Sequence, residues 1–243
     1  MTAAIRLYRL LLQLLQPEYW LVRRFVAEMV ADPLSKLPVV DVGGGRAPHG
    51  RALYQARPRA PQIVVDLTPA PELSLVADAA RLPIASDTAG VVAMFQVLQH
   101  VEAPSVVLAE IRRVLAPQGA LLITYPSMLP QGASRDLWRW THAGAERLLA
   151  DAGFTILHHR PLGGFFFLLT ANAAALPGRL LIRHESGWRS GRRASDYLRV
   201  GLALLLAAPW HILGYPALAL DRLRPAKSYQ TGGLLLARRT DHG

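Results

Sequence analysis

The feature that most constrains the fold is an alternation, from residue 37 to residue 160, of short β-rich runs with stretches whose apolar residues recur at helical spacing. The β-rich runs predict strands at residues 37–42, 62–67, 73–77, 91–95, 120–125, 154–159 and 231–237. Helical patterns near residues 47–57 and at 104–115 separate strands, and Thr141 is placed to N-cap another helix that ends before Gly153. Because strands that alternate with helices pair in parallel, this order predicts an α/β fold with helices on both faces of the sheet.

The first predicted strand leads directly into three consecutive glycines at positions 43–45. A glycine turn at the end of a strand lets the backbone approach a nucleotide-like ligand closely, because no Cβ is in the way. A dinucleotide-binding fingerprint would need glycine or alanine at position 48, where this chain has proline. Asp41 would repel a pyrophosphate but suits a cationic ligand such as S-adenosylmethionine, which carries an ammonium and a sulfonium. The alternative is a tight turn that binds no ligand.

Two more acidic residues follow at the ends of the next predicted strands. Asp66 ends the second strand, where a carboxylate can accept hydrogen bonds from two ribose hydroxyls. Asp78 follows the third strand and is placed to accept from an exocyclic amine such as N6 of adenine. Taken singly, each acid is more simply a helix cap or a solvated strand end. Three acids at three successive strand ends favour one shared ligand site.

The chain resembles a known family in the stretches VVDVGGG, VVDLTPAP, VADAARLPIASDTAGVVAMFQVLQHVEAP and LAEIRRVLAPQGALLITYPS. Over residues 38–160 it is similar to class I S-adenosylmethionine-dependent methyltransferases of the type 11 kind. The resemblance implies a Rossmann-like, seven-stranded, mostly parallel sheet whose last strand is antiparallel. It also implies an enzyme with S-adenosylmethionine as cofactor, bound by Asp41, Gly43, Gly44, Gly45, Asp66, Leu67, Asp78, Ala79, Phe95 and Gln96.

Two positions depart from the family pattern. Ala47 stands where many members carry a third glycine, and Gln99 replaces the usual glutamate in the segment VLQHV. If that glutamate only orders a turn, Gln99 can replace it by hydrogen bonding. If the glutamate has a chemical role, the substitution affects activity.

The acceptor side of the site is less defined by the sequence. Methyl transfer from a sulfonium is a direct displacement that mainly needs alignment, and a hydroxyl acceptor also benefits from a general base. The base candidates are His100, Asp136 and His142. The alternatives are a buried histidine that orders a turn, for His100, and a local ion pair with Arg139, for Asp136. Candidates for acceptor binding are Tyr125, Trp138, Arg139 and Trp140.

The stretch DLWRWT, residues 136–141, resembles a signature of methyltransferases that are encoded with cell-envelope polysaccharide genes. Those relatives often carry a histidine shortly before the aspartate, and this chain has QGAS at that place, residues 131–134. A catalytic histidine is therefore not predicted there. The two tryptophans of the stretch are expected to stack on a sugar or simply to pack.

Composition and the N-terminus bear on partners and location. The net charge of +10 favours anionic partners, and the absence of cysteine excludes disulfides and thiolate metal ligands; no metal site is predicted. Residues 1–20 have an apolar centre like that of a signal peptide, but Arg6 and Arg9 interrupt its start and no small-residue cleavage site follows. We therefore expect a retained, cytoplasmic N-terminus. Residues 5–15 predict an amphipathic helix that packs on the domain or lies on a membrane surface.

Residues 161–230 form an insertion between the predicted sixth and seventh strands, which a short loop joins in the simple family fold. The insertion contains an uncharged run of 21 residues at positions 200–220, about 31 Å long as a helix. Two spans would place arginines outside, and Pro209 and Pro216 are expected to break a spanning helix. We therefore predict two broken helices on an anionic membrane surface, with contacts from Arg183, Arg189, Arg192, Arg193, Arg199 and Trp210.

Other interpretations of the insertion are a homodimer interface and a cap over the active site. Nucleic acid is disfavoured as a partner, because the leucine-rich runs beside the arginines suit lipid better than a phosphate backbone. The predicted domains are N-terminal helices at 1–36, the methyltransferase core at 37–160, the insertion at 161–230, and the last strand and tail at 231–243.

The resulting hypothesis is a monotopic methyltransferase on the inner face of the cytoplasmic membrane. It would O-methylate a lipid-linked or cell-envelope glycan acceptor, at a site formed by residues 126–142 with the N-terminal helix and the insertion. Two alternatives stay open. One is a methyltransferase of a soluble small molecule, with the insertion as lid or dimer contact. The other is a non-catalytic, membrane-associated protein that keeps the cofactor pocket.

Overall fold

The structure, a computed structural model, describes residues 17–30, 36–45, 50–71, 73–131, 135–181, 194–223 and 229–240. The chain divides into two compact units. One unit, the core, comprises Tyr19–Leu162 and Gly232–Gly243; the other comprises Met1–Glu18 and Gly163–Thr231. The predicted helix at 5–15 lies outside the described residues, and so do Arg183, Arg189, Arg192 and Arg193.

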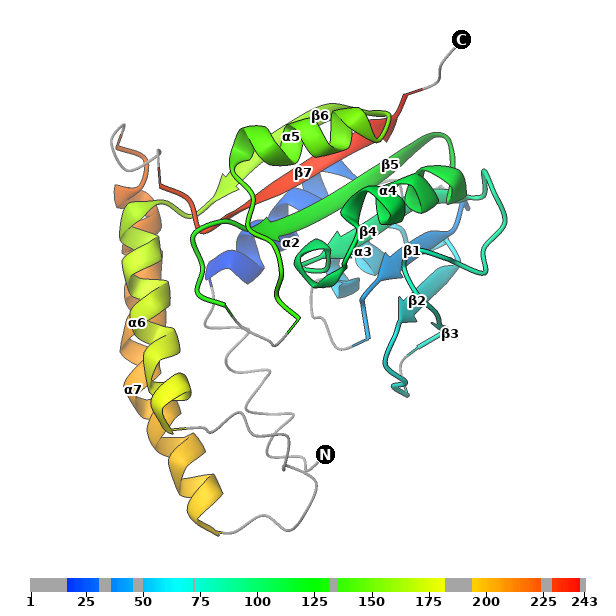
Figure 1. Cartoon of the computed structure of the whole chain (residues 1–243). Coiled ribbons are helices and arrows are strands. Elements are labelled where there is room, and N and C mark those ends of the chain that lie inside the picture. Colours follow the sequence, from blue (N-terminus) through cyan, green and yellow to red (C-terminus); the bar gives the residue numbers. More distant parts are fainter. Residues whose placement is uncertain are drawn as a thin grey trace. The chain divides into compact units, whose positions relative to one another are not determined.

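The core is built on one seven-stranded sheet (Figure 1). Its strands are β1 (Val39–Val42), β2 (Gln62–Asp66), β3 (Leu75–Val76), β4 (Ala89–Phe95), β5 (Leu115–Pro126), β6 (Phe154–Leu162) and β7 (Gly232–Arg239). They lie in the order β3-β2-β1-β4-β5-β7-β6. Only β7 is antiparallel to its neighbours, β5 and β6, so the predicted fold class is confirmed. The strand order reverses between β1 and β4, which is where α/β sheets of this kind bind ligands.

Helices cover both faces of the sheet (Figure 1). On one face lie α4 (Pro104–Val114) and α5 (His142–Asp151), whose apolar residues, such as Ile111 and Leu149, are fully buried in one cluster. On the other face lie α3 (Gly50–Ala56) and most of α2 (Pro17–Met29), which bury Leu53, Phe25 and Val26 in a second cluster. The segment Tyr19–Met29 therefore belongs to the core of the protein.

Local signals set several of the helix and strand ends. Thr141 caps α5 as predicted, because its Oγ1 accepts a hydrogen bond from the backbone N–H of Gly144 at 3.1 Å. Gly153 follows that helix with a φ of 78°, a conformation that favours glycine. Strand β5 starts five residues earlier than predicted, at Leu115, and an irregularity in its pairing with β4 absorbs the turn-forming residues 116–119.

The second unit contains two helices, α6 (Phe165–Leu181) and α7 (Ala194–Leu220), which pack together as an antiparallel hairpin (Figure 1). Asp221, just after α7, closes the base of the hairpin. Its carboxylate accepts hydrogen bonds from the backbone N–H groups of Gly164, Phe166 and Phe167 at 2.7 to 3.1 Å. A carboxylate at this place satisfies N–H groups that the first turn of α6 leaves without a partner, and it complements the helix dipole.

The prediction of broken helices is wrong. Pro209 and Pro216 both lie inside α7, which runs continuously for 27 residues, and Pro177 lies inside α6. Each proline removes one backbone hydrogen bond, but the bonds of the neighbouring turns and the packing of α7 along α6 keep the helix continuous. Of the described residues, only Gly201–Leu220 is long and apolar enough to cross a bilayer, by length and composition alone.

Candidate active site

The glycine turn follows β1 at the carboxyl edge of the sheet. Gly43 has a φ of 74°, and a Cβ at this position would collide with the side chain of Val97. A Cβ on Gly45 would lie 2.9 Å from Oδ2 of Asp66. The bare turn therefore lets β1, β2 and the residues after β4 approach one another at one edge. The following residues, 46–49, lie outside the described part of the chain.

Asp41 lies beneath this turn and is almost completely buried. Its Oδ2 accepts a hydrogen bond from the Tyr54 hydroxyl at 3.0 Å, whereas its Oδ1 is buried with no hydrogen-bond partner among the described residues. Burial is the main cause that raises the pKa of Asp41 to about 7; the charge of Asp66 raises it further, and the Tyr54 hydrogen bond opposes the shift. A buried carboxyl group with one oxygen left without a protein partner is typical of a site that receives a positive charge.

This shift predicts how cofactor affinity depends on pH. A cationic ligand near Asp41 favours its carboxylate form, and because the pKa is raised, that form is fully populated only above about pH 7. We expect the affinity for S-adenosylmethionine, measured by calorimetry, to rise by up to about 10-fold between pH 6 and pH 8. The Asp41→Asn variant is the control, since it should lose most of that pH dependence. An unchanged slope in Asp41→Asn would show that another group, such as the cofactor amine, causes it.

Asp66 ends β2 beside the glycine turn. Its Oδ2 accepts from the Gly45 backbone N–H at 3.3 Å, and its Oδ1 accepts from the Thr68 N–H at 2.9 Å. These bonds fix the carboxylate but use only part of its capacity, because an ionised carboxylate can accept about four hydrogen bonds. The remaining acceptor positions can take a vicinal diol. Leu67, the next predicted cofactor contact, is exposed.

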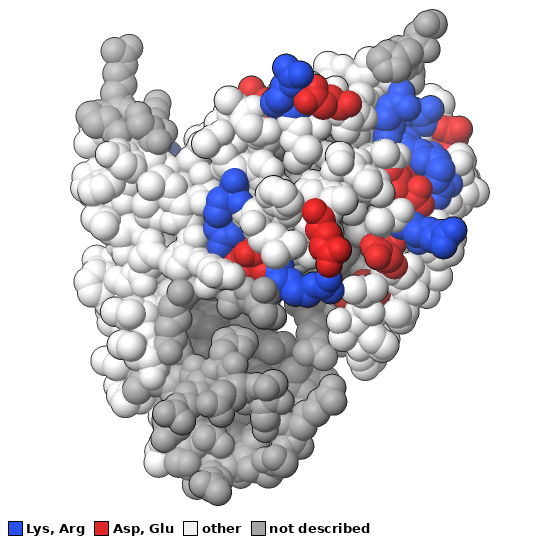
Figure 2. Space-filling view, viewed as in Figure 1, with Lys and Arg blue, Asp and Glu red and all other residues white. Residues whose placement is uncertain are grey.

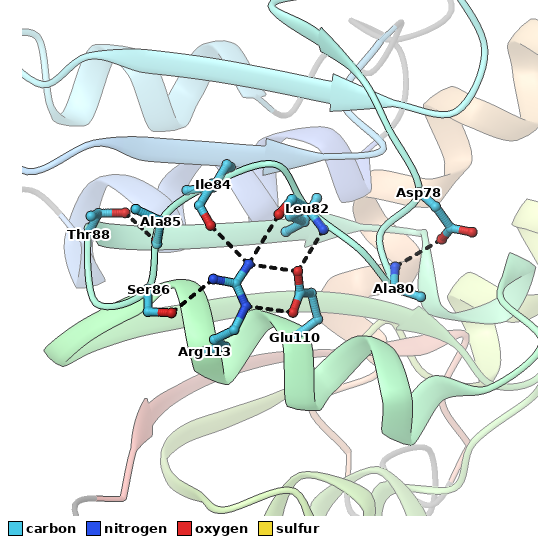
Figure 3. Close-up of polar contacts among 9 residues, drawn as sticks. All are labelled: Asp78, Ala80, Leu82, Ile84, Ala85, Ser86, Thr88, Glu110 and Arg113. Carbon is cyan, nitrogen blue, oxygen red and sulfur yellow. Dashed lines mark hydrogen bonds and ion pairs between the residues drawn. The ribbon is translucent and has the colours of Figure 1, made fainter.

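Asp78 lies after β3, on the loop that leads toward β4. It is exposed, and its Oδ1 accepts a hydrogen bond from the backbone N–H of Ala80 at 2.9 Å (Figure 3). This bond closes a local turn around Ala79, which is partly buried against the core. The turn holds the Asp78 carboxylate at the edge of the sheet.

The same loop is anchored to α4 by one arginine (Figure 3). Arg113 donates hydrogen bonds to the backbone oxygens of Leu82 and Ile84 at 3.1 and 2.9 Å, and to Oγ of Ser86 at 3.0 Å. It also pairs with Glu110 at 2.8 Å, and Glu110 accepts from the Leu82 N–H at 2.7 Å. The guanidinium thereby satisfies backbone groups of an irregular segment and fixes the loop that carries Asp78.

The end of β4 contains a strained residue, Gln96, which has a φ of 56°. Its backbone N–H donates to Oγ1 of Thr124 at 2.9 Å, and its side-chain oxygen accepts from Nε2 of Gln99 at 3.2 Å. Gln99 is buried, so this residue orders the turn after β4 by hydrogen bonding. The side chain of Phe95 is also buried, so only its backbone is left to contact a ligand at the carboxyl edge of the sheet.

The predicted base candidates have different surroundings. His100 is exposed, not buried, and its Nδ1 lies 3.1 Å from the backbone oxygen of Arg135. Asp136 forms a two-pronged ion pair with Arg139, at 2.5 and 2.7 Å, and its side chain is only 6% exposed. Arg139 also donates to the backbone oxygens of Leu129 and Pro130. The ion pair therefore fixes the loop before α5, as the alternative interpretation proposed.

The aromatic candidates form one cluster. Trp138 and Trp140 stack with ring centroids 6.3 Å apart, and Trp138 is 40% exposed. Tyr125 meets the edge of Trp140 but is itself completely buried. Its hydroxyl lies 2.7 Å from Nε2 of His159, beneath the surface that an acceptor could contact. The exposed tryptophan face is the part of this cluster that an acceptor can reach.

The sequence did not indicate two further residues of this region, Glu146 and His159. His142 lies beside Glu146 and His159, and Glu146 accepts a hydrogen bond from Nδ1 of His159 at 2.8 Å. Burial is the main cause that lowers the pKa of His159. The spacing of four residues between His142 and Glu146 is a signal for one helix face, but nothing local in the sequence connects β6 to it.

The geometry thus places a glycine turn and three carboxylates at the carboxyl edge of the sheet. Comparison with known proteins agrees: residues 41–123 match the family model of a methyltransferase domain. This segment is therefore similar to methyltransferase domains, as the resemblance to class I S-adenosylmethionine-dependent methyltransferases predicts. The match spans the glycine turn, Asp66, Asp78 and the strained end of β4, so it supports the expected cofactor and reaction class for these residues.

The proteins that this chain resembles are named for different methyl acceptors. The chain is 35% identical over 118 residues to the malonyl-[acyl-carrier protein] O-methyltransferase of Alcanivorax borkumensis, and the match covers 43% of this chain and 40% of the relative's length. The fold resembles a putative sarcosine dimethylglycine methyltransferase from Galdieria sulphuraria (TM-score 0.58, 14% identity, 92% of this chain, 87% of the other). It also resembles phosphoethanolamine N-methyltransferase 2 of Haemonchus contortus with S-adenosyl-L-methionine (TM-score 0.57, 13% identity, 93% and 54%).

Proposed function

We propose that this protein is an S-adenosylmethionine-dependent O-methyltransferase that works at a membrane surface on a lipid-linked acceptor. The methyltransferase domain supplies the reaction class. The observation that supports membrane binding is the distribution of side chains on the α6–α7 hairpin. In a soluble protein, large apolar side chains are mostly buried, whereas on this hairpin most of them are exposed.

Most of the buried positions of the hairpin carry small residues, with Phe167 as a large exception, and most of its large apolar residues are exposed. The buried positions include Ala174, Ala203, Ala207 and Ala217. The exposed ones are Leu169, Leu176, Leu180, Leu198, Leu202, Leu205, Leu206, Trp210, Ile212, Leu213, Tyr215 and Leu220. Close packing through small residues with leucines turned outward is typical of helices that pack in lipid. In water, an apolar surface of this extent would favour association.

Among the described side chains, the visible flank of the hairpin lacks charge. In Figure 2, the flank formed by the described parts of α6 and α7 shows no lysine, arginine, aspartate or glutamate. The segment Gly201–Leu220 contains no charged residue on any side, and only 24% of it is buried. The hairpin can therefore sink into the acyl boundary. The arginines at sequence positions 183–199 would then meet anionic headgroups, although the side chain of Arg199 is not described.

Both ends of the hairpin join the core at Leu162–Gly163 and Thr231–Gly232. Because β6 and β7 belong to the same sheet, the hairpin starts and ends on one side of the membrane. Such a hairpin either lies on the membrane or crosses it twice, and the apolar stretch of α6, Phe165–Pro177, is too short for a span. This favours a monotopic protein, which we place on the cytoplasmic face. It does not favour a single span.

For the core, we propose that the backbone of the turn Gly43–Gly45 and the charge of Asp41 receive the methionine end of the cofactor. Asp66 would accept from the ribose hydroxyls and Asp78 from the adenine amine. The acceptor would stack on the exposed face of Trp138. A glycan acceptor is favoured by the resemblance of DLWRWT to methyltransferases of envelope glycans, and the malonyl-carrier relative is also an O-methyltransferase.

The proposed function is tested with purified full-length protein, methyl-labelled S-adenosylmethionine and a membrane extract from the host. We expect label to appear in the organic phase. Label that appears only in the aqueous phase would overturn the lipid-linked acceptor and favour a soluble one. Cofactor binding without any transfer, in extracts from several growth conditions, would favour the non-catalytic alternative.

A further inference from the structure

A cluster of metal-ligating side chains lies between α5 and β6, where the sequence analysis predicted no metal site. His142 and Glu146 are four residues apart on α5, so both project from the same face of that helix. His159 faces them from β6. One ligand atom from each of the three residues lies within 4.8 Å of the other two. We propose that these three residues bind a divalent transition-metal ion of the zinc class.

The donor set fits this class of ion. Two imidazole nitrogens and one carboxylate oxygen are a common three-residue set for zinc, and they leave a fourth position for water or another oxygen ligand. At zinc bond lengths of about 2.0–2.1 Å, tetrahedral ligand atoms lie about 3.3 Å apart. Here, Oε1 of Glu146 lies 2.8 Å from Nδ1 of His159 and 3.7 Å from Nε2 of His142. All three ligand atoms lie within 4.8 Å of one another, so rotation of the side chains, chiefly of His142, can bring them to the required spacing.

The surroundings of His159 are those of a metal-binding histidine. Its side chain is 5% exposed, and its second nitrogen, Nε2, lies 2.7 Å from the Tyr125 hydroxyl. Without a metal, Nδ1–H of His159 donates to Glu146; when an ion binds Nδ1, the proton lies on Nε2, which then donates to the phenol oxygen and holds the ring in place. The side chains of His142 and Glu146 are 37% and 44% exposed, so an ion can enter from that side.

A hydrogen-bonded chain from Glu146 through His159 to Tyr125 would explain those three residues without a metal. His142 brings a second imidazole to the same carboxylate, at 3.7 Å. The ring of His142 lies face to face with that of His159, with centroids 3.1 Å apart, and its Nε2 approaches the carboxylate oxygen that His159 already contacts. When a metal binds, the more exposed ring of His142 turns so that its nitrogen points at the shared ion.

The test uses the purified full-length protein, stripped of metal with a chelator and titrated with Zn²⁺ against a chromophoric competitor. We expect each chain to bind one Zn²⁺ tightly. The affinity for Zn²⁺ should fall at least about 10-fold in His142→Ala, Glu146→Gln and His159→Asn, and by about 10- to 100-fold in Tyr125→Phe. The matched control is His158→Ala. His158 is adjacent on β6, but its ring packs near Phe25, on the opposite face of the sheet.

A second measurement separates metal binding from folding. We expect Zn²⁺ to raise the Tm of the metal-free wild type and of His158→Ala, and to leave the Tm of His142→Ala unchanged. His142 is partly exposed, so its substitution should leave the fold intact. A tight equivalent that persists undiminished in the three ligand variants, or no tight binding by the wild type, would overturn the proposal. The outcome does not depend on the proposed acceptor, because binding and Tm are read without turnover.

Discussion

Replacing Leu202, Leu205 and Leu213 together by glutamine is expected to release the protein from membranes. These leucines are 46 to 71% exposed on α7, so they contribute little to packing within the hairpin and present their area to the surroundings. Burial of a leucine side chain in an apolar medium stabilises by about 1.5–3 kcal/mol. Three partly exposed leucines should together contribute about 3 kcal/mol or more, which corresponds to a loss of about 100-fold in partitioning.

The measurement is flotation of the full-length protein with vesicles that contain anionic lipid. The matched control replaces three exposed apolar residues of the core, Leu37, Val106 and Leu157, by glutamine. We expect the control to float with the vesicles and the hairpin variant to stay in the soluble fraction as a folded protein. If both variants float like the wild type, the hairpin is not the membrane contact. An oligomer that dissociates in the hairpin variant, with no flotation of the wild type, would show a dimer interface.

Replacing Asp66 by alanine is expected to abolish measurable methyl transfer through loss of the cofactor. The variant removes the proposed acceptor of the ribose hydroxyls, and it leaves the N–H groups of Gly45 and Thr68 without this partner. Hydrogen bonds to a charged group contribute about 1.5–3 kcal/mol each. We therefore expect calorimetry to show an affinity for S-adenosylmethionine that is lower by about 10- to 100-fold or more.

The control for Asp66→Ala is Asp151→Ala at the end of α5. Asp151 is an exposed carboxylate, 58% accessible, that pairs with Arg147 within its own helix. Its removal should change neither the fold nor the affinity for the cofactor, because surface pairs of this kind contribute little. Undiminished cofactor affinity in a folded Asp66→Ala variant would contradict the position proposed for the ribose.

The cofactor edge could be predicted because its signals are local. Asp41, Asp66 and Asp78 each follow a run of strand-forming residues, and the carboxyl ends of parallel strands meet at one edge. Glycine is needed in the turn after β1 because Gly43 has a positive φ and because a Cβ at Gly43 or Gly45 would collide with neighbouring side chains. A short run of glycines in the sequence therefore indicates this turn directly. The strand order then follows from the family resemblance.

The acceptor side and the metal cluster could not be predicted in the same way. Whether Asp136 acts as a base or pairs with Arg139 depends on how one loop folds back on itself, and the sequence only places the two residues three apart. The cluster at His159 depends on the packing of α5 against β6. Its members become neighbours only through that packing.

The insertion shows a different limit of sequence reasoning. The content of apolar residues was clear, but the effect of Pro209 and Pro216 was overestimated, because the penalty for a proline is local and the packing along α6 is distributed over the whole helix. The sequence also could not show which apolar residues face inward. Only the packed hairpin reveals that the alanines lie inside and the leucines outside.

The most direct test of the central claim compares methyl transfer by the wild type with transfer by the variant that carries glutamine at positions 202, 205 and 213. Both proteins would be given labelled S-adenosylmethionine and the host membrane extract reconstituted in vesicles. We expect the variant to bind the cofactor with wild-type affinity but to transfer at least about 10-fold less label to the lipid fraction. Equal transfer by the two proteins would contradict a methyltransferase that reaches its acceptor through the α6–α7 hairpin.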